Sequence, residues 1–415
     1  MSKITALRHI LRWGFPVTIG AGLLLLATSL LLAPPVYNVK KAGAKGDGFT
    51  NDTRIFLRVL EQAAATGRGA TIIVPPGTYL LEVNKPLPLA SGVTLRGSGQ
   101  PILLFREPAG ASHGFEGISI HGRGIRVEGV TVDGGSRLNR GIGIHTGSSD
   151  VQITNSQVRQ LSQPANPRDP LYSTVVAGVM IYGNTSDILI QNCEITRIAA
   201  RSGTPVARGI MVWSEPGQTI AQRVHILNNR ITHITPREDA DGIFFDKAPI
   251  TSPLSQSVIA GNMIHHVAKR GIKIATPGVE VQSNYIYNSY QGNNRYVTSQ
   301  QEPLPQDMYA AISIYADKVT VADNRISGAG SYYNAIEADI GVSSGYLRGI
   351  VITDNIIDSG GQPKPVRNTS GIRLGAVREF RIAGNRITGT ESAIRLSEEA
   401  RTAIRAGAKG YLSQP

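Results

Sequence analysis

The sequence predicts an all-β protein, a parallel β-helix solenoid of about nine or ten stacked coils. The first observation is a short segment, Gly or Ala followed by apolar-x-apolar, that recurs nine times along the chain. The second is a longer unit, apolar-x-apolar-x-x-Asn-x-Ile, that recurs between these segments. The third is the content of 46 glycines in 415 residues, which suits many tight turns.

Residues 271–286 display the repeat most clearly. Ile272 and Ile274 flank Lys273, and this alternation is the period of a strand with one buried face. After a Pro-Gly turn a second strand alternates in the same way, and Asn284 precedes the third. Three short strands joined by turns predict one triangular coil.

Each predicted first strand begins at a small residue. These residues are Gly141, Gly178, Gly209, Gly242, Gly271, Ala311, Ala335, Gly371 and Ala393. The Asn of the longer unit is found at Asn229, Asn262, Asn284, Asn324, Asn355 and Asn385, with Ser156 and Cys193 in earlier copies. A coil cannot bury its own apolar face, so the coils are expected to share one core. The stacked amides are expected to form a hydrogen-bonded ladder.

Composition narrows the classes of partner. The formal net charge of +12 favours anionic partners such as an acidic polysaccharide or lipid headgroups. The charges are scattered and form no basic run, so no nucleic-acid partner is expected. A single cysteine, Cys193, rules out an internal disulfide. The sequence gives no indication of the oligomeric state.

Residues 1–35 are interpreted as a membrane anchor or signal segment. Three basic residues precede an uncharged run from Trp13 to Pro35, which is long enough to span a bilayer at about 20 residues. The basic flank is expected to stay cytoplasmic and the rest to be exported. We therefore expect a membrane-anchored protein facing outside the cytoplasm, or a secreted one if the segment is cleaved.

Residues 36–104 form the predicted capping segment and first coils. Gly43-Ala-Lys-Gly-Asp-Gly48 is followed by Asn51-Asp-Thr, then by a predicted helix that is capped near Asn51. Pro75-Pro-Gly-Thr-Tyr79 comes next. This order resembles the N-terminal segment of the pectate-lyase-like superfamily, which contains pectin-degrading enzymes, related glycosidases and phage tail-spike depolymerases. The resemblance implies a single-stranded, right-handed β-helix whose N-terminal helix shields its open end.

The coils are expected to occupy residues 105–396, and residues 397–415 a C-terminal capping helix and tail. Long insertions fall mostly between the third strand of one coil and the first strand of the next. They are Arg159 to Ala177, Arg197 to Arg208, Thr232 to Asp241, Asn288 to Ala310 and Ser359 to Ser370. Insertions at one recurring corner are expected to form a wall beside a flat sheet, and hence a groove.

The outward positions of the first strands supply the candidate site. Residues one and three after the small residue are predicted to point inward, and residues two and four after it outward. The catalytic candidates are Asp241, Asp246, Lys273, Glu337 and Asp339, and the substrate-binding candidates are Tyr182, Trp213, Phe244, Arg270, Tyr315 and Arg373. Aromatic rings suit stacking on sugars, and carboxylates with cations suit acid–base work on a glycosidic bond.

Two segments are similar to polygalacturonase motifs. Arg270-Gly-Ile-Lys-Ile-Ala-Thr276 resembles the strand whose two basic residues hold the substrate carboxylate, with Lys273 at the first basic position and Ala275 replacing the second. Asp239-Ala-Asp-Gly-Ile243 resembles the catalytic segment and puts Asp241 at the position of the acid. The paired Asp-Asp and the Gly-His-Gly of that family are absent.

The expected function is that of an exported enzyme that cleaves or modifies an acidic polysaccharide, as a glycoside hydrolase or a polysaccharide lyase. In a lyase, Lys273 or Arg373 would be the base, and Glu337 with Asp339 would hold Ca²⁺. An epimerase would use similar parts, and no metal ligand is assigned otherwise. The alternative is a non-catalytic glycan-binding or adhesive β-helix of the cell envelope.

Overall fold

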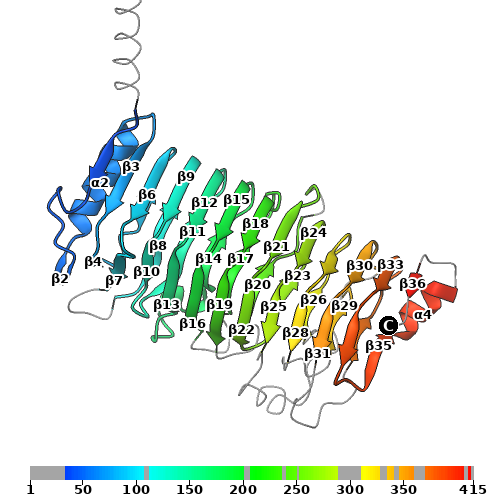
Figure 1. The fold of residues 1–415 in the computed structure, drawn as a ribbon. Helices are drawn as coiled ribbons and strands as arrows, with labels where there is room; N and C mark the ends of the chain where they lie inside the picture. The colour runs from blue at the N-terminus through cyan, green and yellow to red at the C-terminus, as the bar shows by residue number, and fades with distance from the viewer. Residues whose placement is uncertain are drawn as a thin grey trace, which may run out of the picture.

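The chain winds into a parallel β-helix with three long sheets, as Figure 1 shows for this computed structural model. The structure describes residues 33–106, 112–200, 206–235, 240–249, 252–287, 310–327, 334–340, 345–358, 370–405 and 410–412. Residues 1–32, most of the predicted anchor, lie outside these ranges. Within them, no helix has the length and the apolar character needed to cross a membrane.

Each sheet collects one strand from every coil. Sheet A contains β1 (Val36–Asn38), β3 (Ala70–Val74), β6 (Val93–Gly97), β9 (Arg123–Glu128), β12 (Ser149–Thr154), β15 (Ser186–Gln191), β18 (Gln222–Leu227), β21 (Ser257–Ala260), β24 (Val279–Gln282), β27 (Thr320–Ala322), β30 (Ile350–Thr353), β33 (Phe380–Ala383) and β36 (Gly410–Leu412).

Sheet B lies across the next corner of the coil. It contains β2 (Asp47–Asn51), β4 (Thr78–Leu81), β7 (Ile102–Phe105), β10 (Thr131–Asp133), β13 (Gln157–Ser162), β16 (Glu194–Ala199), β19 (Arg230–Thr235), β22 (Met263–Val267), β25 (Tyr285–Tyr287), β28 (Arg325–Ser327), β31 (Ile356–Asp358) and β34 (Arg386–Thr388).

Sheet C is built from the predicted first strands. It contains β5 (Leu87–Leu89), β8 (Gly114–Ile120), β11 (Leu138–Ile144), β14 (Val176–Ile181), β17 (Ala207–Val212), β20 (Asp241–Phe245), β23 (Ile272–Ile274), β26 (Ala310–Ile314), β29 (Asn334–Ala338), β32 (Ser370–Leu374) and β35 (Ser392–Leu396). The nine predicted first strands are confirmed, from β11 to β35. Two earlier strands, β5 and β8, extend the sheet toward the N-terminus.

The core and the tight corners explain the repeat. Ile272 and Ile274 are fully buried, as predicted for residues one and three after the leading Gly271. The leading residue lies inside an extended strand, and it must be small because the backbone of the next coil approaches it closely. A Cβ on Gly178 would lie 2.6 Å from the carbonyl oxygen of Gly209 in the next coil, too close for any side chain to fit without movement.

The predicted asparagine ladder is present. The Oδ1 atom of Asn324 accepts from the backbone N–H and the side-chain amide of Asn284, at 3.0 and 2.9 Å. The Asn324 amide in turn donates to Asn355 Oδ1 at 3.0 Å. The same pattern runs from Asn229 to Asn385, and all of its members are buried. The ladder satisfies buried backbone groups at a corner where the strands end.

The N-terminal signature is a packing unit. Backbone N–H groups of Lys45 and Gly46 donate to the two carboxylate oxygens of Asp52, at 2.7 and 2.9 Å. A Cβ on Gly46 would lie 2.8 Å from the ring of Tyr79, and the N–H of Thr78 donates to the Gly46 carbonyl. The motif glycines therefore let two segments touch, which is why the signature residues occur together.

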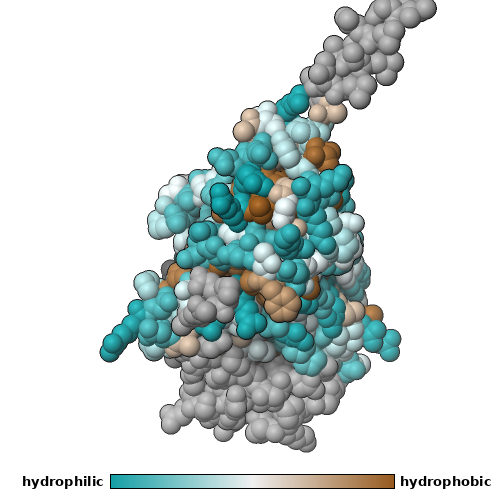
Figure 2. All heavy atoms as spheres, turned by 90° about the vertical axis from the view of Figure 1, so that its left-hand side faces the viewer, coloured by the Kyte–Doolittle hydropathy of each residue, from teal (hydrophilic) through white to brown (hydrophobic). Residues whose placement is uncertain are grey.

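A helix covers each end of the solenoid (Figure 1). Helix α2 (Thr53–Ala65) buries Phe56, Val59 and Leu60 against the first coils, and α4 (Glu398–Arg405) lies at the other end. Asp52 is the residue before α2, yet its side chain makes no capping bond, because it holds the preceding loop. Viewed toward the α2 end, the described surface is mainly hydrophilic with small hydrophobic spots (Figure 2). Such capping hides the edge strands that would otherwise pair with other chains.

We predict that Asn324→Ala lowers the free energy of unfolding by about 3 kcal/mol, because it leaves several buried hydrogen-bonding groups unpaired at about 1–3 kcal/mol each. Chemical denaturation followed by circular dichroism measures the loss. Asn166→Ala, at an exposed loop position, is the matched control and is expected to change the midpoint little. Equal midpoints for the two variants would show that the ladder does not stabilise the fold.

Candidate functional site

The outer face of sheet C carries three rows of side chains in register from coil to coil. The second and third rows come from the predicted outward positions. The first row comes from the residue before the small leading residue, which alternation alone would place inward. The first row runs through Glu116, Arg140, Ala177, Arg208 and Asp241. The second row runs through Ser119, Gly143, Met180, Met211, Phe244, Lys273, Ser313, Glu337, Arg373 and Arg395. The third row runs through His121, His145, Tyr182, Trp213, Asp246, Ala275, Tyr315 and Asp339, linked by backbone hydrogen bonds between successive coils.

In the first row, Asp241 is fully buried between two arginines. Arg270 Nε donates to one of its oxygens at 3.0 Å, and Arg208 Nη1 lies 3.2 Å from the other. The side chains of Arg208 and Arg270 are 2% and 0% exposed. A bound polymer therefore cannot reach the predicted acid Asp241 or the predicted ligand Arg270. Charge pairing between neighbouring coils accounts for an aspartate at position 241 and an arginine at position 270.

The predicted aromatic platform is largely a second apolar cluster on the outside of the sheet. Met180, Met211, Phe244 and Tyr182 are buried, and Val175, from the insertion before β14, packs against them. Of the predicted sugar-stacking residues in this part of the face, Trp213 is half-buried and thus more accessible than Tyr182 or Phe244. It contacts the edge of Tyr182, with ring centroids 6.0 Å apart.

The middle of the face presents Asp246, Lys273 and Tyr315, all half-buried. The ammonium group of Lys273 lies 4.7 Å from the ring centre of Phe244 and 5.5 Å from that of Tyr315. These cation–π contacts hold the ammonium group between two coils. Asp246 is in the third row one coil earlier, and its Oδ1 accepts from the backbone N–H of Lys247 at 2.7 Å.

Two predicted carboxylates meet on one arginine. Arg373 Nη1 donates to Glu337 Oε1 and, at 3.0 Å, to Asp339 Oδ2. Glu337 is 6% exposed and also accepts from the Asn334 amide at 2.8 Å, whereas the side chain of Asp339 is 21% exposed. Burial raises the pKa of Glu337, and the charge of Arg373 acts in the opposite direction. Sequence reasoning grouped these three residues, and the structure brings them into contact.

Glu337 and Asp339 do not form a suitable calcium site. The Arg373 guanidinium already bonds to both carboxylates. Ca²⁺ takes about six to eight oxygen ligands. Within the described residues no three His, Cys, Asp or Glu side chains are grouped so that they would hold a metal ion. The hypothesis that Glu337 and Asp339 bind Ca²⁺ therefore finds no donor set here.

Sequence reasoning did not recognise Glu116 and His121, which form a polar cluster with His145 and Arg140 at the N-terminal end of the face. His145 Nε2 lies 2.8 Å from Glu116 Oε1, and Arg140 is buried nearby. The available signal was a repeat within the first strands, Gly117-Ile-Ser-Ile-His121 followed by Gly141-Ile-Gly-Ile-His145. It places histidines at the same outward position on two successive coils.

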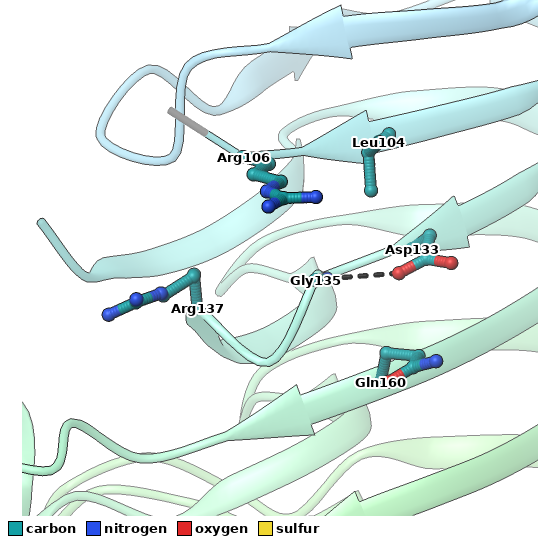
Figure 3. A pocket seen from close by; sticks show the side chains of 6 residues that line it. All are labelled: Leu104, Arg106, Asp133, Gly135, Arg137 and Gln160. Carbon is teal, nitrogen blue, oxygen red and sulfur yellow. Dashed lines mark hydrogen bonds between the residues drawn. The ribbon is translucent and has the colours of Figure 1, made fainter. Parts of the chain in front are cut away.

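Two depressions lie on the sheet B side, away from these rows. One, of about 410 Å³, is lined by Leu104, Arg106, Asp133, Gly135, Arg137 and Gln160 (Figure 3). Asp133 there accepts from the Gly135 N–H and from Arg159 Nε. The other, of about 290 Å³, includes Glu194, Arg230 and His233. Neither contains a predicted site residue, so the candidate site remains the face of sheet C.

Comparison with known proteins supports the architecture. A family model described as "Rhamnogalacturonase A/epimerase, pectate lyase-like" matches residues 36–294, and one described as "Right handed beta helix region" matches residues 208–406. The preneck appendage protein of Bacillus phage PZA is 29% identical over 123 residues, 28% of this chain. That match spans 14% of the phage protein's length.

Two solved structures share the fold at low sequence identity. The catalytic unit of a GH87 alpha-1,3-glucanase from Streptomyces thermodiastaticus aligns with a TM-score of 0.59 at 16% identity, covering 91% of this chain and 68% of that one. The Streptococcus pneumoniae surface protein and adhesin PfbA aligns with a TM-score of 0.58 at 15% identity, covering 87% and 99%. One of these structures is an enzyme and the other an adhesin, so the fold alone does not assign the reaction.

Substitution of the buried Asp241 distinguishes a structural role of this residue from a catalytic one. Asp241→Ala is expected to destabilise the protein by about 3–5 kcal/mol, because it removes the buried carboxylate that two buried arginines share. Asp246→Ala, in the half-buried third row of the same coil, is expected to cost under about 1 kcal/mol. Denaturation midpoints measure both. A fully stable but inactive Asp241→Ala variant would instead support the catalytic assignment suggested by the sequence.

Proposed function

Because the chain belongs to the rhamnogalacturonase A/epimerase, pectate lyase-like family, we propose that it hydrolyses an acidic polysaccharide bound along the outer face of sheet C. The observation that carries this proposal is the pair of carboxylates, Glu337 and Asp339, on Arg373. Glu337 Oε1 and Asp339 Oδ2 both lie within 3.0 Å of Arg373 Nη1, so the two oxygens are within about 6 Å of each other. Retaining glycosidases hold their two carboxyl groups about 5–5.5 Å apart.

The two carboxylates have environments suited to different roles. Glu337 is almost fully buried and its raised pKa favours the protonated form, so it is assigned as the acid that protonates the leaving oxygen. Asp339 is more exposed and is held by Arg373 and by the backbone N–H of Ala376. It is assigned as the nucleophile. Arg373 positions both and offsets the negative charge.

The rest of the face supplies substrate binding. Lys273 lies two coils before Glu337 in the same row, at about 10 Å, and its ammonium group suits a uronate carboxylate. Tyr315 and Trp213 in the third row provide half-buried rings for stacking on sugars. Asp246 and Asp339 are three coils apart, about 14 Å, which is too far for them to flank one bond as a pair.

We predict that the protein releases reducing ends from a uronate-containing polymer, and that Glu337→Gln and Asp339→Asn each lower kcat at least about 100-fold. Glu280→Gln, at an exposed position on β24 of sheet A, is the matched control and is expected to retain wild-type activity. A reducing-sugar assay on a panel of pectic, alginate and other uronate polymers measures the rate. If the products instead carry ultraviolet-absorbing unsaturated ends, and Lys273→Ala no longer makes them, the reaction is elimination with Lys273 as the base.

The raised pKa of Glu337 predicts the direction in which kcat/KM changes with pH. A general acid must be protonated, so the alkaline limb of kcat/KM is expected above the ordinary glutamic pKa of about 4.3. On an aryl glycoside, whose leaving group needs no proton, Glu337→Gln is expected to retain activity and lose this limb. An unchanged alkaline limb in that variant would assign the acid to another residue.

A non-catalytic role is the second candidate. Asp241 and Glu337 are each paired with buried or half-buried arginines. Ion pairs that only stabilise a fold look the same, so this pairing favours a non-catalytic role. It predicts saturable polymer binding without any product. In that case Trp213→Ala would weaken binding, and Glu337→Gln and Asp339→Asn would leave it unchanged.

We also propose that residues 1–35 direct export, leaving the β-helix outside the cytoplasm and attached to the membrane or secreted. The proposal is supported by the basic flank and the uncharged run of the sequence. Protease accessibility of the β-helix in intact cells tests the location. Retention of the β-helix in the cytoplasmic fraction would contradict it.

A further inference from the structure

The N-terminal end of the outer face holds a cluster of polar side chains that the proposed hydrolysis does not use. We call it the histidine cluster, and it consists of Glu116 and His121 on and after β8, Arg140 and His145 on and after β11, and Tyr182 after β14. His145 lies six coils before Asp339 in the third row, which corresponds to about 29 Å. The cluster is therefore separate from the carboxylate pair.

A buried carboxylate holds one nitrogen of His145. Glu116 is 4% exposed, and its Oε1 lies 2.8 Å from His145 Nε2. The side chain reaches across the sheet because Gly143 lies beneath it: a Cβ on Gly143 would lie 1.7 Å from Glu116 Oε2. A carboxylate on one imidazole nitrogen fixes the tautomer and stabilises the imidazolium that forms when the other nitrogen takes a proton.

Stacking fixes the plane of the imidazole. His145 lies between His121 and Tyr182, with ring centroids 4.3 and 4.9 Å away and interplanar angles of 12° and 16°. Its side chain is nevertheless 24% exposed. A ring that is oriented on both faces and still reaches solvent is suited to proton transfer with a bound molecule.

A buried cation lies beside this pair. Arg140 is 7% exposed, and its guanidinium carbon lies 4.2 Å from the ring centre of Phe115 and 5.4 Å from that of Tyr182. Within the described residues, Arg140 Nε and Nη1 and Glu116 Oε2 are buried and have no hydrogen-bond partner. Arg140 and Glu116 are neighbours in register and their opposite charges compensate. Their unpaired buried atoms still cost about 1–3 kcal/mol each, which a bound ligand that pairs with them would recover.

We propose that the histidine cluster is a second, acid–base site for a uronate unit of the polysaccharide, in which His145 takes the proton from the carbon next to the carboxylate. Glu116 is the positioning residue for His145. The positive charge of Arg140 stabilises the negative charge that develops on the sugar, as preorganised charges do in dry sites. The inference rests on the proposed function, because both need an acidic polysaccharide on this face.

Removal of the C5 proton can lead to either of two reactions. When His145 removes the C5 proton, the electron pair left on C5 spreads onto the carboxylate oxygens. A water molecule on the opposite face of C5 returns a proton there and inverts that carbon, and the hydroxide that remains takes the proton held by His145. Alternatively, the pair forms a C4=C5 double bond while the C4–O bond breaks, and the departing oxygen takes a proton from water. Epimerisation and elimination are therefore the two outcomes of one proton removal.

The experiment uses the full chain with polygalacturonate or alginate in D₂O. Deuterium at C5, read by mass spectrometry and NMR, reports epimerisation, and absorbance of unsaturated ends reports elimination. We expect one of these signals in the wild type, a loss of at least about 100-fold in His145→Gln and of about 10-fold in Glu116→Gln. His225→Gln, an exposed histidine on β18 of sheet A, is the matched control and should behave as wild type.

The two active-site proposals can fail separately. Elimination also frees a reducing end, so hydrolysis is followed here by its products with saturated non-reducing ends. Glu337→Gln is expected to lose these products and keep the proton-abstraction signal. A wild type that releases reducing ends but shows neither deuterium nor unsaturated ends would overturn the histidine cluster alone, as would a fully active His145→Gln. A wild type that shows no product of any kind on these polymers would overturn both. If His145→Gln unfolds, as judged by its denaturation midpoint, the Glu116→Gln rate decides.

Discussion

Parallel pairing between coils is the constraint on which this structure depends. Each strand hydrogen-bonds to its counterpart one coil away, so residues at the same step of the repeat stack above one another whatever the length of the loops between them. Asn284 and Asn324 are 40 residues apart in sequence, yet their side chains bond at 2.9 Å. The same register aligns Lys273, Ser313 and Glu337 on the outer face of sheet C.

Stacking at close spacing forces neighbouring charges to compensate one another. Coils are about 4.8 Å apart, so an unpaired buried charge would face its neighbours at short range. Asp241 lies between two arginines, and Arg373 joins Glu337 to Asp339. Exposure distinguishes these two networks. The first is sealed, whereas Asp339 and Arg373 are reachable, which is why the proposed chemistry is assigned to the second.

The repeat was readable because it has a physical cause at each position. The leading glycines, the inward isoleucines and the ladder asparagines each satisfy a steric or hydrogen-bonding requirement of the coil, so the nine first strands could be predicted. Strand β5, Leu87–Leu89, has no small leading residue. Strand β8 does contain the pattern, at Gly117-Ile-Ser-Ile120, but it precedes the first recognised ladder position and was left out of the predicted set. The histidine cluster was missed with it, since Glu116 lies on β8 and His121 directly follows it.

The sequence by itself determined the solenoid, its capping helices and the two alternating rows of outward side chains, because alternation and turn residues act locally. Only the tertiary structure decided which of those side chains remain accessible. Burial depends on residues of neighbouring coils that are remote in sequence, and on contacts such as that of Val175, from the insertion before β14, with the outer apolar cluster. Asp241 and Asp246 have the same chemistry and lie five residues apart, but one is sealed between arginines and the other reaches the surface.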